Sequence, residues 1–83
     1  MNLGIYAIKD TLAECWSNLF VLNTKTANRT FDFMAKEKTE TECKDQKIFL
    51  LGRFDNEQGT ITLLEEPYMV YDLDKEWSKA HGN

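Results

Sequence analysis

The sequence has few of the residues that build compact chemical sites. Among its 83 residues are one histidine, His81, and two cysteines, Cys15 and Cys43, with four glycines and one proline. His81 has no neighbour to orient or activate it, and with the two cysteines it does not make a zinc-binding spacing. The cysteines form neither a CxxC pair nor a disulfide framework, which favours two reduced thiols over a bridge between them.

The glycines stand alone, so the sequence contains no glycine-rich phosphate loop. The densest carboxylate pair, Glu65-Glu66 before Pro67, is typical of a solvated strand end. We therefore expect no enzyme, no metal and no cofactor. No apolar run approaches the roughly 18 residues that span a bilayer, and the first residues lack the pattern of a secretory signal. We expect a protein of the cytosol that does not bind membranes.

Charge is distributed unevenly along the chain. The net charge is −4, but residues 1–53 hold eight Lys and Arg against seven Asp and Glu, whereas residues 54–83 hold two against seven. The composition excludes a strongly basic nucleic-acid binder, because the acidic part repels phosphates unless it is turned away. The composition remains compatible with a modestly basic face formed by the first part of the chain.

The pattern predicts a small α+β domain. Hydrophobic residues make up 42% and aromatic residues 12%, which argues against disorder. Residues 3–8 predict a strand that is buried on both faces, either centrally in a sheet or at a subunit contact. Residues 10–17 fit either a helical turn with the capping box Thr11-Leu-Ala-Glu14 or a hairpin connection into a strand at 18–22. The hairpin is favoured.

A helix is expected from Lys25 to about Lys38, because Ala27, Phe31, Met34 and Ala35 fall on one helical face. Residues 38–45 read as a solvated helix end or loop. An apolar run precedes Asp55-Asn-Glu-Gln-Gly59, and a segment of alternating apolar and polar residues follows it. This arrangement predicts a hairpin over 47–64.

Pro67 predicts a stop, because proline cannot donate to a strand ladder. Residues 68–71 follow as a fifth, edge strand or an arm, and the rest as a polar tail. The predicted order is β-β-α-β-β with a C-terminal extension: an antiparallel sheet of four to five strands, with one helix on one face. We place the domain at 1–67 and the acidic extension or arm at 68–83.

Aromatic side chains near cations are the remaining functional signal, because proteins that bind single-stranded DNA combine stacking surfaces with a modestly positive groove. The alternative is that most of these rings form the core of so short a chain. The residues that we predict to bind nucleic acid are Lys9, Lys25, Arg29, Lys36 and Arg53 as phosphate contacts and Tyr6 and Phe33 as stacking partners.

The C-terminal acidic segment allows two other interpretations. Asp72, Asp74, Glu76 and Trp77 are typical of an acidic-aromatic segment that docks on a basic surface, either that of a partner or the protein's own cationic face. The alternative is a tail that folds back and packs Trp77.

Three segments carry a resemblance to a known family. The opening Gly4-Ile-Tyr-Ala-Ile-Lys-Asp10, the segment Ala27-x-Arg-x-Phe31, and Leu51-Gly-Arg-Phe-Asp55 followed by Gly59-Thr-Ile61 occur in order over residues 4 to about 67. Together they resemble the small nonstructural protein of gokushoviruses, which are tailless single-stranded DNA phages of the microvirus family. The chain departs from that pattern in lacking a glycine at 11–19 and in its longer, more acidic end.

The resemblance implies a DNA-binding accessory of phage replication, with no enzymatic site to carry over. Our first hypothesis is a protein of the host cytoplasm that binds single-stranded DNA without marked sequence preference during replication and packaging, as a homodimer. The rival hypothesis is an interaction module that binds a host or phage replication or capsid protein through the acidic segment and a sheet edge.

Overall fold

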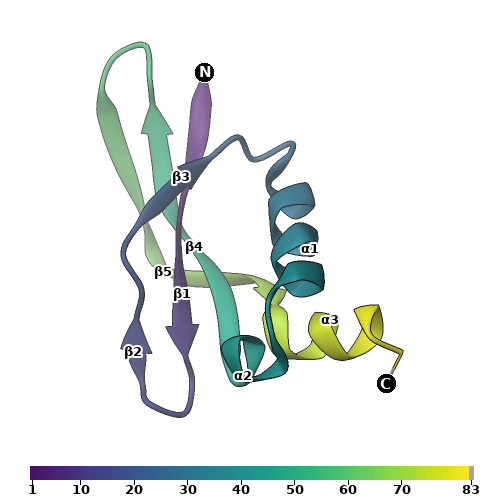
Figure 1. Cartoon of the computed structure of the whole chain (residues 1–83). Helices are drawn as coiled ribbons and strands as arrows, with labels where there is room; N and C mark the ends of the chain where they lie inside the picture. Colours follow the sequence, from purple (N-terminus) through teal and green to yellow (C-terminus); the bar gives the residue numbers. More distant parts are fainter. Residues whose placement is uncertain (83) are drawn as a thin grey trace.

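A computed structural model describes residues 1–82 as a bent antiparallel sheet with three helices gathered on one side (Figure 1). The strands are β1 (Asn2–Asp10), β2 (Cys15–Trp16), β3 (Phe20–Leu22), β4 (Gln46–Asp55) and β5 (Thr60–Asp72). The helices are α1 (Ala27–Glu37), α2 (Glu40–Cys43) and α3 (Leu73–Ala80). The α+β class and the antiparallel sheet with a helix on one face are confirmed, and α2 and α3 are two further helices that the sequence did not predict.

Strand β1 lies at the centre of the sheet. The order is β2-β1-β4-β5, and β3 pairs with β1 on the same edge as β2. Residues 17–19 separate β2 from β3, where the Ser17 hydroxyl accepts a hydrogen bond from the Ile8 backbone N–H at 2.8 Å. The hairpin interpretation of residues 10–17 is therefore confirmed, and the central position of β1 agrees with apolar residues on both of its faces.

The turn between β1 and β2 forms without glycine. Glu14 adopts a left-handed φ of 55°, and the Asp10 carboxylate accepts hydrogen bonds from the backbone N–H groups of Leu12 and Ala13 at 3.0 and 2.9 Å. An aspartate that bonds the backbone two and three residues onward stabilises a turn locally. The Asp10 side chain thus stabilises the turn in place of the alternative capping box at Thr11.

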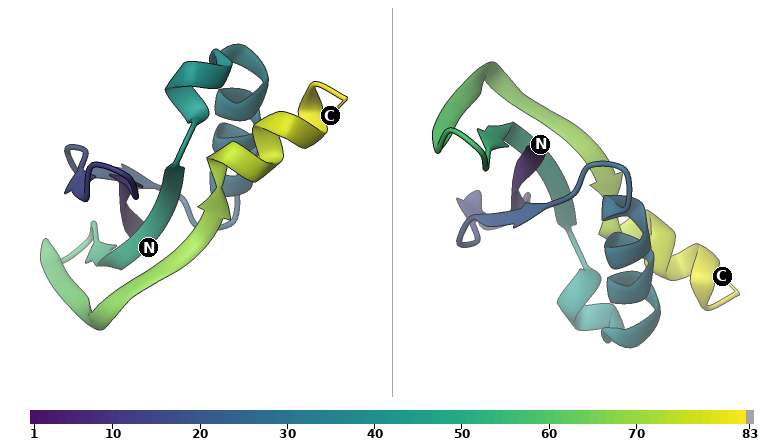
Figure 2. Two further views of the ribbon diagram at one scale, coloured as in Figure 1. Left: turned by 90° about the horizontal axis from the view of Figure 1, so that it is seen from below. Right: turned by 90° about the horizontal axis from the view of Figure 1, so that it is seen from above.

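The hairpin of β4 and β5 turns where the sequence predicted. Asp55 accepts hydrogen bonds from Glu57 N–H and Gln58 N–H, and Gly59 has a φ of 72°. The predicted stop at Pro67 is wrong, because β5 continues through it to Asp72 and bends midway (Figure 2). Residues 64–67 fall between the paired Leu63 and Tyr68, so the missing proline N–H interrupts no ladder bond. The expected division after residue 67 thus lies inside β5.

The core lies between the sheet and the helices. Phe31 and Ala35 of α1, Cys43 of α2 and Leu73 of α3 pack with Tyr6, Ile48 and Leu50 of the sheet. Cys43 is buried and Cys15 exposed, and both are free thiols. The helices therefore cover one face of the sheet, and the functional surfaces must be sought on the outer side of α1, at the sheet edges and on the opposite face.

Candidate nucleic-acid interface

Helix α1 presents a row of cations and one aromatic ring to solvent. Its buried residues, Ala27, Phe31 and Ala35, face the core. Arg29, Phe33 and Lys36 follow at spacings of four and three residues on the opposite side and are exposed, and such spacings place side chains in one row along a helix. Lys25 lies in the turn two residues before α1 and is exposed as well. We call Lys25, Arg29, Phe33 and Lys36 the α1 stripe.

Phe33 is the unusual member of the α1 stripe. Its side chain is 63% exposed, whereas a phenylalanine on a helix is ordinarily turned inward. Among the described residues, none of the three cations of the stripe is held in an ion pair. Asp32 is turned aside and accepts a hydrogen bond from the Tyr71 hydroxyl at 2.7 Å. The stripe thus offers an aromatic face between cations whose side chains are free to meet phosphate.

Arg53 lies on the same face of the sheet as the helices and is exposed. It pairs with Gly4, whose other neighbour, Leu22, leads towards α1. Burial raises the pKa of Tyr6 and the positive charge of Arg53 opposes that rise. Arg53 therefore belongs to the helix side of the molecule, near the end at which α1 begins.

Two of the predicted nucleic-acid contacts lie elsewhere. Tyr6 is only 4% exposed and its ring packs against Phe20 and Phe31 at centroid distances of 5.9 and 5.4 Å. Its prediction as a stacking partner is corrected, because no ring face is left for a base. Lys9 lies on the opposite face of the sheet, with its Nζ 5.5 Å from the centre of the Trp16 ring.

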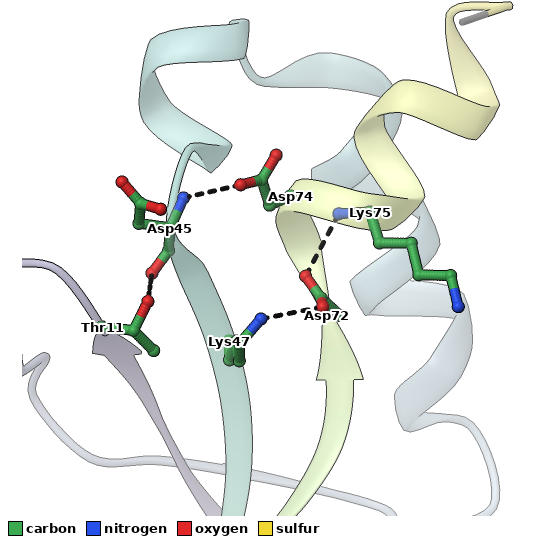
Figure 3. A network of polar contacts seen from close by, with 6 residues as sticks. All are labelled: Thr11, Asp45, Lys47, Asp72, Asp74 and Lys75. Carbon is green, nitrogen blue, oxygen red and sulfur yellow. Dashed lines mark hydrogen bonds and ion pairs between the residues drawn. The ribbon is translucent and has the colours of Figure 1, made fainter.

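The acidic segment is folded back on the domain, as Figure 3 shows. Asp72 accepts a hydrogen bond from Lys75 N–H at the start of α3 and pairs with Lys47 at 2.8 Å. Asp74 accepts a hydrogen bond from Asp45 N–H, and the Asp45 carbonyl in turn accepts one from Thr11. These carboxylates attach α3 to β4 and to the β1–β2 turn.

Trp77 completes the attachment of α3. Its indole N–H donates to the Lys38 carbonyl at 3.0 Å, and its ring packs on the core while stacking on His81 at 4.1 Å. Of the predicted partner-binding residues, Glu76 lies near Lys79, 3.5 Å away. The interpretation of a tail that packs Trp77 therefore describes this structure.

A small open cavity of about 230 Å³ lies between α1 and α3. Sequence reasoning missed it, because its residues are far apart in the chain. It is lined by carboxylates and lysines together, with Tyr71 at its wall: Asp32, Lys36, Tyr71, Glu76 and Lys79. Burial and the neighbouring Asp32 raise the pKa of Tyr71 well above its ordinary value. This mixture of charges does not select an anion or a cation.

Within residues 1–82, no three His, Cys, Asp or Glu side chains gather as a metal site would require. In the same part of the chain, no helix has the length and apolar character needed to cross a membrane. The features that can bind a ligand are therefore the α1 stripe with Arg53 and the face of the sheet that carries no helix.

Comparison with known proteins gives one match. No curated protein and no solved structure matches the chain. The family described as Phage ORF5 protein matches residues 3–75, which include β1 from its second residue, the other four strands, α1, α2 and the start of α3. The match therefore covers the α1 stripe, Arg53 and nearly the whole domain. The chain belongs to the phage ORF5 protein family.

Proposed function

We propose that this protein binds single-stranded DNA through the α1 stripe, without sequence preference, during genome replication or packaging of a gokushovirus-type phage. The observation that carries the proposal is the exposure of Phe33 between Arg29 and Lys36 on the outermost side of α1. A base stacks on an aromatic ring whatever its identity, at roughly 1–3 kcal/mol per base. The phage family supports the setting. We propose a non-enzymatic role in the host cytoplasm.

The overall negative charge is compatible with this proposal, because several of the acidic side chains are engaged within the domain. Asp72 and Asp74 hold α3 against β4, and Asp32 on α1 is bonded to Tyr71. Lys25, Arg29 and Lys36 can meet three phosphates, and Arg53 can extend the path at the start of α1. So few contacts predict weak binding that depends on salt.

The test is a titration of fluorescein-labelled oligothymidylate followed by anisotropy at two salt concentrations. Three phosphate contacts predict a slope of about −2 in log affinity against log salt, since each contact to a single strand contributes about −0.7. Phe33→Ala should weaken binding about tenfold while leaving that slope unchanged, because stacking releases no counterions. Arg29→Gln should weaken binding and lower the slope by about 0.7.

Lys44→Gln is the matched control for charge. Lys44 is exposed between α2 and β4, outside the α1 stripe, and its replacement should leave affinity nearly unchanged. The proposal fails if no binding occurs at low salt, if binding is indifferent to salt, or if Lys44→Gln costs as much as Arg29→Gln.

The rival function, capture of a phage or host replication or capsid protein by the acidic segment, has no specific observation in its favour. Asp72, Asp74 and Trp77 are engaged within the chain. Deleting residues 72–83 would also remove the buried Leu73 from the core, so loss of a partner after that truncation would not distinguish recognition from unfolding.

A further inference from the structure

The face of the sheet opposite the helices is apolar and has no helix over it. Side chains alternate along β1, so Tyr6 and Ile8 face the helices while Leu3, Ile5 and Ala7 point to the other side. Residues paired across strands share a face. The register therefore places Val21, Phe49, Phe54, Ile61, Leu63 and Met69 beside Leu3, Ile5 and Ala7. We call this the helix-free face.

Around Ala7 the helix-free face is closed by its own side chains. Trp16 of β2 and Phe49 of β4 flank β1 and meet edge to face at 5.1 Å, and Ala7 between them is 1% exposed. Towards β5 the face is open, because Ile61 is 61% and Leu63 71% exposed. Figures 1 and 2 show the three helices together on one side of the sheet.

The exposed apolar surface on this face is large for so small a chain. Trp16, Val21, Ile61, Leu63 and Met69 are all more than 40% exposed. Together they leave on the order of 500 Å² of apolar side chain in water, towards the upper end for the largest patch of a monomer. That is a large share of the roughly 800 Å² that each partner contributes to a standard interface.

The charged residues that the register places on the helix-free face, Lys9, Lys47 and Asp72, lie at one end of it, whereas Glu65 and Glu66 fall in the part of β5 that pairs with no strand. Lys9 stands over Trp16, and Lys47 and Asp72 neutralise one another in an ion pair at the same end of the sheet. Two copies related by a two-fold axis close to Ile61 and Leu63 bring apolar residues together and carry the two Lys9 side chains to opposite rims. This face is therefore complementary to itself, whereas among residues 1–82 Lys9 is the one cation on it that is not held in an ion pair and could bind nucleic acid.

We propose that two copies of this chain dimerise through their helix-free faces, with β5 and its residues Ile61 and Leu63 at the centre of the interface. The two sheets then pack face to face, as in a sandwich, and the helices lie on the outside of the dimer. The α1 stripes of the two copies consequently point away from the interface. This inference is independent of DNA binding, since the face and the stripe share no residue.

The test is sedimentation equilibrium of the full chain from micromolar to millimolar concentration, with Leu63→Lys and Leu12→Lys as a matched pair. Leu12 lies in the β1–β2 turn and is 80% exposed, so both leucines lose little contact within the monomer. The wild type should sediment with twice the mass of one chain. Leu63→Lys should raise the dissociation constant by about tenfold or more, and Leu12→Lys should leave it unchanged.

Circular dichroism decides whether each variant folds, and Ile61→Lys gives a second disruption of the same surface. Dissociation of Leu63→Lys and Ile61→Lys with unaltered spectra supports the proposed interface. A wild-type protein with the mass of one chain throughout the range overturns it. Equal effects of Leu12→Lys and Leu63→Lys, or dimers that persist in both β5 variants, overturn it as well.

Discussion

Gly4 lies directly against the ring of Tyr6. A Cβ atom placed on Gly4 would come within 2.6 Å of the Tyr6 hydroxyl oxygen and 2.7 Å of two of its ring carbons. The ring cannot move aside cheaply, because Phe20 and Phe31 pack against it. The absence of a side chain at position 4 thus leaves the space that Tyr6, the aromatic residue of β1, occupies in the core.

We expect Gly4→Ala to lower the free energy of unfolding by about 1–3 kcal/mol, the usual cost of overpacking a core. Asn2→Ala is the control, since Asn2 is an exposed residue two positions earlier on the same strand and should change stability by less than about 0.5 kcal/mol. Urea unfolding followed by circular dichroism measures both. Equal stabilities of Gly4→Ala and wild type would mean that Tyr6 has room to shift.

Features with a regular local pattern were predictable from the sequence. The spacing of Ala27, Phe31 and Ala35 set the inward face of α1 and thereby the outward position of Arg29, Phe33 and Lys36. The turn chemistry of Asp55 and Gly59 likewise set the β4–β5 hairpin. The helix face follows from the helical period and the hairpin from hydrogen bonds between side chain and backbone, and both of these act within a few residues.

A local pattern alone could not decide the structure where the same motif occurs twice. Thr11-Leu-Ala-Glu14 and Thr39-Glu-Thr-Glu42 both fit a capping box, but only the second forms one, at the start of α2. The first is overridden by pairing of β2 with β1, which depends on the sheet and not on residues 11–14. Helix α3 was missed for a related reason, since its contacts with Lys47, Asp45 and Lys38 are all distant in sequence.

The left-handed backbone of Glu14 predicts a substitution that stabilises the protein, in contrast to Gly4→Ala. Its φ of 55° costs a residue with a Cβ roughly 1–2 kcal/mol, whereas glycine adopts it freely. Glu14 is exposed and makes no ion pair among the described residues. Glu14→Gly should therefore raise the free energy of unfolding by about 0.5–1 kcal/mol.

Glu14→Val serves as the contrasting variant, because a β-branched residue tolerates a left-handed backbone least. It should lower the melting temperature while Glu14→Gly raises it, both measured by circular dichroism. A decrease in both variants would mean that the Glu14 side chain itself stabilises the turn.

Asp72 combines two roles that substitutions can separate. Its carboxylate caps α3 by accepting from Lys75 N–H and pairs with Lys47. Asp72→Asn retains a side chain that caps helices well but removes the charge, and should cost about 1 kcal/mol of unfolding free energy. Asp72→Ala removes the cap too and should cost about 1 kcal/mol more. Urea unfolding at pH 7 ranks the three proteins.

Measuring stability at acid pH separates the contribution of the Asp72 charge from that of its cap on α3. Burial opposes ionisation of Asp72, but the hydrogen bonds from Lys47 and Lys75 N–H outweigh it, so its pKa in the folded protein lies below the ordinary 3.8. A depressed pKa stabilises the folded state above the unfolded value and loses that effect as pH falls through the folded one. The stability difference between wild type and Asp72→Asn should thus be complete at pH 6 and shrink below about pH 4. A difference that stays constant down to pH 2 would show that the Lys47 pair contributes nothing and that only the geometry of the cap matters.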